Sequence, residues 1–212
     1  MVRFERVGGA SGVIGVAAIA IQLMLVGIAT PDSATLLRHR ARWEAATLLR
    51  MAGGLGIIWF TAGLAARLRR FDARLGGPPT LVLGAGILWG SIWLLSGLFT
   101  SAALSVATTY ADPWGVHLMV VLGVEIVLVL TPAISIAFLA ATGAAVLASP
   151  TFPRRYGYMT LGGAACRAVL AVLDWYGTAN VAMRILDFTL LWVVVTGVHL
   201  LGATRPATPA IA

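Results

Sequence analysis

The chain has 212 residues, of which 59% are hydrophobic and 11% are charged. Soluble globular domains carry about 25% charged residues, so this composition excludes an ordinary soluble protein and indicates an integral membrane protein. All 15 basic residues are arginines, and the lack of lysine excludes a retinal Schiff base, a Walker-type phosphate loop and a lysine nucleophile.

Apolar stretches of about 20 residues, the length that crosses a bilayer as a helix, occur six times along the chain. They lie at residues 12–30, 47–67, 80–103, 115–135, 157–177 and 183–203. We therefore predict an all-α fold, a polytopic transmembrane helix bundle of six spans that forms a single domain over residues 1–212. A cleaved signal peptide is the alternative for residues 12–30, but their 19 residues exceed a signal core of about 7–15.

The placement of the arginines predicts the orientation, because cytoplasmic loops carry the excess of basic residues. If the N-terminus is cytoplasmic, nine arginines lie inside and five lie outside. The outer five are Arg38, Arg40, Arg42, Arg50 and Arg184. We predict an N-in and C-in protein of the cell membrane that contacts anionic lipid on its inner side. The arginines are spread among loops without interleaved aromatic residues, so we expect no nucleic-acid partner.

Two segments depart from simple spans. Residues 33–46 read as an outer helical segment that leads into the second span. The apolar run 116–149 has 34 residues, about 51 Å as a helix, which exceeds one span. Either Pro132 kinks one long helix or it separates two short spans. We favour the kink because the run contains no polar turn.

Three polar residues lie at mid-bilayer depth in three different spans: Gln22, Glu125 and Arg167. An ionisable side chain that faces lipid is unfavourable, so we expect these groups to point inward and to satisfy one another. We predict an ion pair between Glu125 and Arg167. The pair either fixes the register of two helices or lines a ligand cavity, and the sequence leaves both interpretations open.

Tryptophans supply a second signal, because membrane proteins usually hold them at the interfaces. Three instead fall near mid-depth: Trp59, Trp89 and Trp192. A stripe along the third span, with the spacing of one helix face, comprises Trp89, Trp93, Ser96 and Thr100. Indole rings that face the interior suit an apolar or cationic ligand, and filling between helices is the alternative.

Small residues predict close helix packing. Gly86 and Gly90 form a Gly-x-x-x-Gly motif. A ridge of small residues follows Pro132: Ala133, Ala137, Ala141 and Ala145. Both patterns support a bundle and carry no chemistry.

Acidic residues gather toward the outer side. Asp174 shares a helix face with Arg167, and Asp187 shares one with Arg184, either as a vestibule or as interfacial salt bridges. His117 and His199 differ in depth by about 24 Å of helical rise, too far for one metal ion. We therefore expect neither a metal nor a cofactor.

The segments "RFERVGGASGVIGVAAIAIQL", "LLRMAGGLGIIWFTAGLAARLRR", "FPRRYGYMTLGGAA" and "LDFTLLWVVVTGVHLLGATRP" resemble small six-helix membrane proteins common in high-GC actinobacteria. The resemblance covers nearly the whole chain, with loose motifs. That group is mostly without assigned activity, so the resemblance implies a fold and a kind of host but no functional residues.

The pair Trp43 and Glu44 at the start of the second span, with Asp187 in the last, is also similar to membrane-bound terpene cyclases. The resemblance implies an acid that protonates an alkene or epoxide in a dry, aromatic-lined cavity. Burial in apolar surroundings keeps such an acid protonated, and ring faces stabilise a carbocation. The chain differs from these enzymes in helix number and in its arginine-rich outer segment.

Three hypotheses follow. The first is a membrane-embedded enzyme that cyclises or isomerises a hydrophobic, isoprenoid-like substrate, with Glu44, Asp174 or Asp187 as the acid. Its substrate site would be lined by the mid-depth residues Trp59, Trp89, Trp93, Trp192, Gln22, Glu125 and Arg167. The second is a non-catalytic subunit or structural partner of a membrane complex, or a homo-oligomer. A small-solute transporter is the third, and the lack of inverted repeats counts against it.

Overall fold

The computed structural model describes residues 2–26, 31–71, 77–110, 112–149, 152–175 and 188–202. Within these ranges all regular structure is helical. The elements are α1 (Val2–Val26), α2 (Ser33–Arg38), α3 (Arg40–Phe71), α4 (Pro78–Thr109), α5 (Pro113–Glu125), η1 (Ile126–Leu130), α6 (Thr131–Ala148), α7 (Arg154–Trp175) and α9 (Phe188–Gly202). The predicted all-α bundle is therefore confirmed.

Five helices in the described ranges are long and apolar enough to cross a membrane. They cover Arg3–Val26, Arg40–Arg69, Gly77–Thr109, Pro113–Ala148 and Arg154–Leu173. A shorter apolar helix, Thr189–Leu201, lies within the predicted sixth span. These helices suit a multi-pass membrane protein, in agreement with the composition.

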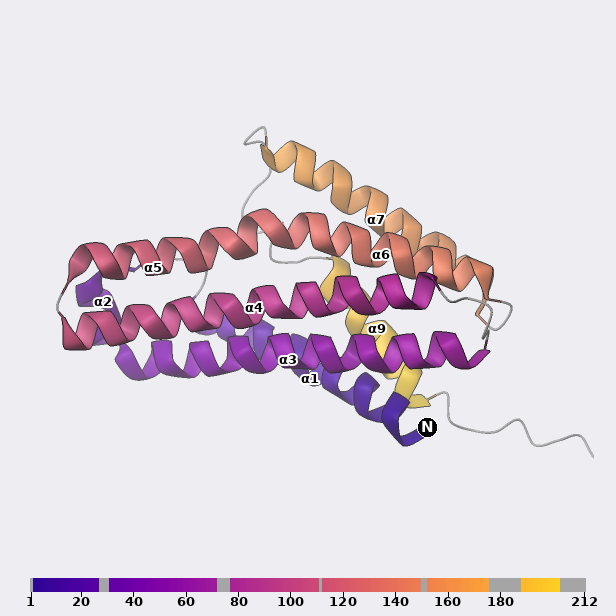
Figure 1. Ribbon diagram of the computed structural model, residues 1–212, viewed down its shortest axis with the longest axis horizontal. Helices are drawn as coiled ribbons and strands as arrows, with labels where there is room; N and C mark the ends of the chain where they lie inside the picture. Colours follow the sequence, from indigo (N-terminus) through magenta and orange to yellow (C-terminus); the bar gives the residue numbers. More distant parts are fainter. Residues whose placement is uncertain are drawn as a thin grey trace, which may run out of the picture.

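The long helices lie side by side. Figure 1 shows α3, α4 and the continuous α5–η1–α6 helix running nearly parallel, with α7 lying obliquely beside α6. One end of the bundle is formed by α2, the start of α3, the end of α4 and the start of α5 (left in Figure 1), and we call it the α2 end. Leu36 of α2 is fully buried there in an apolar cluster with Trp43 of α3 and Val116 of α5.

Glycines bring α1 and α3 into close contact. A Cβ added at Gly8 would lie 2.8 Å from the Cα of Gly63, and one at Gly15 would lie 3.0 Å from the Cα of Gly56. Backbones this close leave no room for side chains, which is how small residues stabilise helix pairs in membranes. The motif predicted at Gly86 and Gly90 acts in the same way, because both glycines pack directly on α3.

The segment 33–46 is helical, as predicted, but it divides at His39 into α2 and the start of α3. Asp32 caps α2: its carboxylate accepts a hydrogen bond of 2.8 Å from the backbone N–H of Thr35. A polar cap of this kind satisfies an amide that the first helical turn leaves free.

Pro132 does not separate two spans. Residues 113–148 form one continuous helix, and the five residues of η1, immediately before Thr131 and Pro132, form a π-helical turn. Proline lacks an N–H and its ring clashes with the preceding turn, so a wider turn accommodates it without a break. The prediction that Pro132 lies within one long helix is confirmed, whereas the predicted kink stays a prediction.

Candidate functional site

A buried arginine lies at the centre of a polar layer between α3, α4 and α5. The Arg50 side chain is buried, with 8% of its surface exposed. Its Nη1 donates to Ser96 Oγ at 2.9 Å and to Thr100 Oγ1 at 3.1 Å. The Ser96 hydroxyl in turn donates to the backbone carbonyl of Gly123 at 2.6 Å. We call Arg50, Ser96 and Thr100 the Arg50 layer.

The local sequence explains how α4 presents these hydroxyls. Trp89, Trp93, Ser96 and Thr100 recur at the spacing of one helix face. All four side chains are buried, so the prediction that this stripe faces the interior is confirmed. The Thr100 hydroxyl also donates to the Ser96 carbonyl one turn earlier at 3.0 Å, which leaves its oxygen free to accept from Arg50.

Gln22 of α1 lies at the same level of the bundle. On α1, Gly15 packs against Gly56 and Ile19 packs against Gly53 of the antiparallel α3. Three residues further along α1, Gln22 therefore lies at the level of Arg50. The Gln22 side chain is fully buried, and neither its amide nitrogen nor its amide oxygen has a hydrogen-bond partner among the described residues.

Other donors near this level are also unused. The Nε of Arg50 and the indole Nε1 of Trp93, one turn from Ser96, are buried and have no hydrogen-bond partner in the part of the chain that the structure describes. Within the described ranges no carboxylate forms an ion pair with Arg50. Buried polar groups in folded proteins are nearly always satisfied, so this set of donors is a candidate ligand site.

The depth of the layer makes a guanidinium charge without a counter-ion costly in free energy. Trp114 is 80% exposed at the start of α5, the position expected for an interfacial tryptophan. Gly123, which accepts from Ser96, lies about 14 Å further along the helix at 1.5 Å per residue. Insertion scales assign a charged side chain at the centre of a membrane helix a cost of about 2.5–3.5 kcal/mol. A bound anion would offset that cost.

A second interior cluster is aromatic and lies toward the opposite end. Trp192 of α9 contacts Phe60 at 6.2 Å, Phe138 at 5.7 Å and Tyr156 at 6.1 Å between ring centroids. Its indole N–H donates to Thr160 Oγ1 at 3.0 Å. Because these rings pack on one another, four helices are joined through Trp192.

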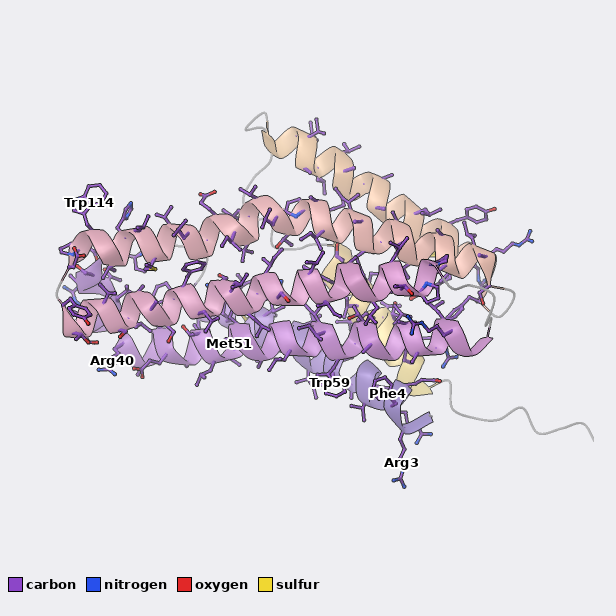
Figure 2. The ribbon with its side chains drawn as sticks, viewed as in Figure 1. Arg3, Phe4, Arg40, Met51, Trp59 and Trp114 are labelled. Atoms are coloured by element: carbon purple, nitrogen blue, oxygen red, sulfur yellow. The ribbon has the colours of Figure 1, made fainter. Side chains whose placement is uncertain are left out.

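Trp59 does not face the interior with the other tryptophans. Its side chain is 49% exposed and packs against Phe4, with a centroid separation of 6.0 Å, and Figure 2 shows both rings on the outer side of α3. The inward positions on this part of α3 are taken by Ile57 and Phe60, both fully buried. The prediction that the Trp59 ring faces the interior with the other mid-depth tryptophans is therefore wrong.

The predicted ion pair between Glu125 and Arg167 is not formed in the described structure. The Nε of Arg167 is buried 3.5 Å from Ser135 Oγ on α6, whereas the Glu125 side chain is exposed. Gly123 faces α4, and Glu125 is two residues, about 200° of helical rotation, further on. The prediction of the pair considered only the depth of the two residues. Their positions around the helix axes keep the two side chains apart.

None of the three predicted acids is placed at the Arg50 layer: one lies near the α2 end, and the side chains of the other two lie outside the described residues. Glu44 is exposed near the α2 end. Its carboxylate accepts a hydrogen bond of 2.6 Å from Arg40 Nε, in an ion pair between residues one helical turn apart. The side chain of Asp174, at the end of α7, and the whole of Asp187 lie outside the described residues.

Sequence reasoning missed Arg50, which it assigned to the outer loop. Two signals were available: Arg50 lies inside the predicted span 47–67, and the hydroxyls of Ser96 and Thr100 interrupt the apolar third span. A guanidinium and two hydroxyls at related depths are a reason to expect contact between neighbouring helices.

In the described ranges no three His, Cys, Asp or Glu side chains come together as metal ligands. No protein-family model matches the chain, and searches of curated proteins and of solved structures find no similar protein.

Proposed function

We propose that the chain is a multi-pass protein of the cell membrane that binds the anionic group of an amphiphilic ligand at the Arg50 layer. The observation that carries this proposal is the burial of Arg50 between two hydroxyls, without a carboxylate partner among the described residues. The ligand group is a carboxylate or a phosphate, which a guanidinium binds through paired N–H donors.

The surroundings favour an amphiphile over a soluble ion. The donors of the site lie among apolar helices, and the unpaired amide of Gln22 and indole of Trp93 offer further hydrogen bonds to a polar head group. A ligand that brings its own apolar tail reaches this depth without leaving the bilayer. With the N-terminus inside, as the arginine distribution favours, the ligand would enter from the outer leaflet.

The hypothesis of acid catalysis on an isoprenoid-like substrate receives less support. It requires an acid kept protonated in dry surroundings, whereas Glu44 is exposed and paired with Arg40. Its remaining candidate acids are Asp174 and Asp187. An enzyme that holds an anionic isoprenoid through Arg50 would be compatible with our proposal, and binding is the step to test first.

The test is to purify the full chain from its native membrane in mild detergent and to identify what remains bound. Mass spectrometry of the extracted lipids detects an amphiphile, and ion chromatography of the denatured sample detects a free anion. Arg50→Gln is compared with wild type, and Arg42→Gln is the control because Arg42 is exposed on the same helix.

We expect one class of anionic amphiphile in wild type and in Arg42→Gln, reduced at least about tenfold in Arg50→Gln, because hydrogen bonds to charged groups contribute about 1.5–3 kcal/mol. Thr100→Val, which removes one hydroxyl without changing charge, should give a smaller reduction. Equal amounts of ligand in all variants, or only a free inorganic anion, would contradict the proposal.

A further inference from the structure

A second feature lies on the outside of the bundle, on the continuous helix α5–η1–α6. An exposed stripe runs along it at intervals of three or four residues: Leu118, Leu122, Glu125, Val129, Ala133 and Ala137. We call it the Glu125 stripe. In Figure 1 this helix forms an edge of the bundle, and α7 lies beside α6 but not beside α5.

Glu125 is the single charged member of the Glu125 stripe. It lies about 16 Å along the helix from the interfacial Trp114 at 1.5 Å per residue, near the middle of a hydrocarbon core about 30 Å thick. Among the described residues it has neither a hydrogen-bond partner nor an ion-pair partner. An ionisable group exposed at this depth is rare and marks a functional position.

The shape of the stripe favours a helix as its occupant. Leu118 is 52% exposed and Val129 is 61% exposed, and they flank the carboxylate on both sides. Ala133 and Ala137 continue the stripe with small side chains, which allow a second helix to approach closely. The π-helical turn begins at the residue after Glu125, a feature frequent at functional sites.

Charge identifies the kind of helix. A carboxylate in hydrocarbon is best matched by a cation. In the described part of this chain, exposed arginine side chains lie toward the ends of helices: Arg3, Arg6, Arg38, Arg40, Arg42, Arg69, Arg154 and Arg155. A second copy therefore offers no exposed cation at the depth of Glu125 from these regions, and two copies related by symmetry would bring like charges together.

We propose that the Glu125 stripe docks a transmembrane helix of a different membrane protein, and that this helix presents an arginine or lysine to Glu125. The inference is independent of the Arg50 layer, because Gly123 turns toward α4 while Glu125 points away from it. It gives the chain a place as one subunit of a membrane complex.

The experiment is photo-crosslinking in the native membrane with a benzophenone amino acid at Leu122 or Val129. The control position is Leu98, an exposed leucine on α4 that is not part of the Glu125 stripe. We expect one discrete crosslinked product at the two stripe positions and none at Leu98. Sequencing of the crosslinked peptide should place it in a transmembrane segment that contains arginine or lysine.

Charge exchange then tests the pairing itself. Glu125→Arg should abolish the crosslink, and a carboxylate at the partner's basic position should restore it. Glu125→Gln, which preserves shape, should reduce the yield severalfold. A product formed with a second copy of this chain or with its own Arg184, an insensitivity to Glu125→Arg, or a lack of any product would each overturn the proposal. Binding at Arg50 is measured separately, so one proposal can fail without the other.

Discussion

Arg50 of α3 and Ser96 of α4 are joined by a hydrogen bond of 2.9 Å across the interior of an apolar bundle. The Ser96 hydroxyl also joins α4 to α5, because it donates a hydrogen bond to the backbone carbonyl of Gly123. Three helices are thus held at one level by one guanidinium and one hydroxyl. Since interhelical hydrogen bonds in membranes contribute about 0.6–2 kcal/mol each, the layer fixes the register of α3, α4 and α5 as well as forming a ligand site.

Ser96→Ala should lower the free energy of unfolding by about 1–3 kcal/mol, because it leaves a donor of Arg50 and the carbonyl of Gly123 without their partner. Unfolding in detergent, followed by circular dichroism, measures the change. Ser105→Ala is the matched control, since Ser105 is exposed on the same helix. Equal effects of the two substitutions would show that the Arg50 layer contributes nothing specific to stability.

The sequence predicted the features of this fold that depend on composition and spacing. Apolar runs of membrane length gave the helices, and the spacing of Trp89, Trp93, Ser96 and Thr100 gave the buried face of α4. Pro132 was correctly kept within one helix, because no polar turn surrounds it.

The predictions that were wrong concern how residues are oriented around the helix axes. Glu125 and Arg167 were matched by depth, but nothing in a uniformly apolar helix specifies which side meets a neighbour. The prediction for Trp59 was wrong for the same reason. The glycines that decide how α1 crosses α3 act through backbone contact, and a hydropathy pattern contains no information about such contact. Arg50 was missed because a charge near the start of a span reads as part of a loop.

The N-terminal turn of α2 should weaken in acid. The hydrogen bond from Thr35 holds the pKa of the Asp32 carboxyl below its usual 3.8, so the charged form stabilises the folded turn. That stabilisation is present at pH values above the unfolded pKa and is lost as the pH falls through the lowered folded pKa. The protection factor of the Thr35 amide, which is its intrinsic hydrogen-exchange rate divided by its observed rate at the same pH, should fall in the acid range.

Asp32→Asn is the control for this prediction, because asparagine caps helices nearly as well and does not titrate. Protection of the Thr35 amide in the variant should be independent of pH in the acid range. The same acid-induced loss in wild type and variant would assign the effect to some other group.

Substitution at Trp192 should separate ring packing from hydrogen bonding. Trp192→Phe retains an aromatic ring against Phe60 and Phe138 and loses the hydrogen bond to Thr160, at a cost of about 0.5–1.5 kcal/mol. Trp192→Ala removes the whole ring and should cost about 3–5 kcal/mol. The two changes are compared by unfolding in detergent. Trp59→Ala, at a half-exposed ring, should cost far less, and a cost equal to that of Trp192→Ala would contradict the assignment of Trp192 to the core.

Two glycine substitutions test the contact between α1 and α3 with an internal control. At Gly56 an added Cβ would lie 2.6 Å from the Cα of Gly15 and 2.6 Å from the Ser11 carbonyl oxygen, so Gly56→Ala forces two backbones apart. Overpacking of this kind costs about 1–3 kcal/mol. At Gly84, on α4, an added Cβ meets nothing within 4 Å, so Gly84→Ala should be neutral or stabilising by up to about 1 kcal/mol through helix propensity. Opposite signs in the two unfolding free energies would confirm that backbone contact joins α1 to α3, and a neutral Gly56→Ala would show that the two helices do not meet there.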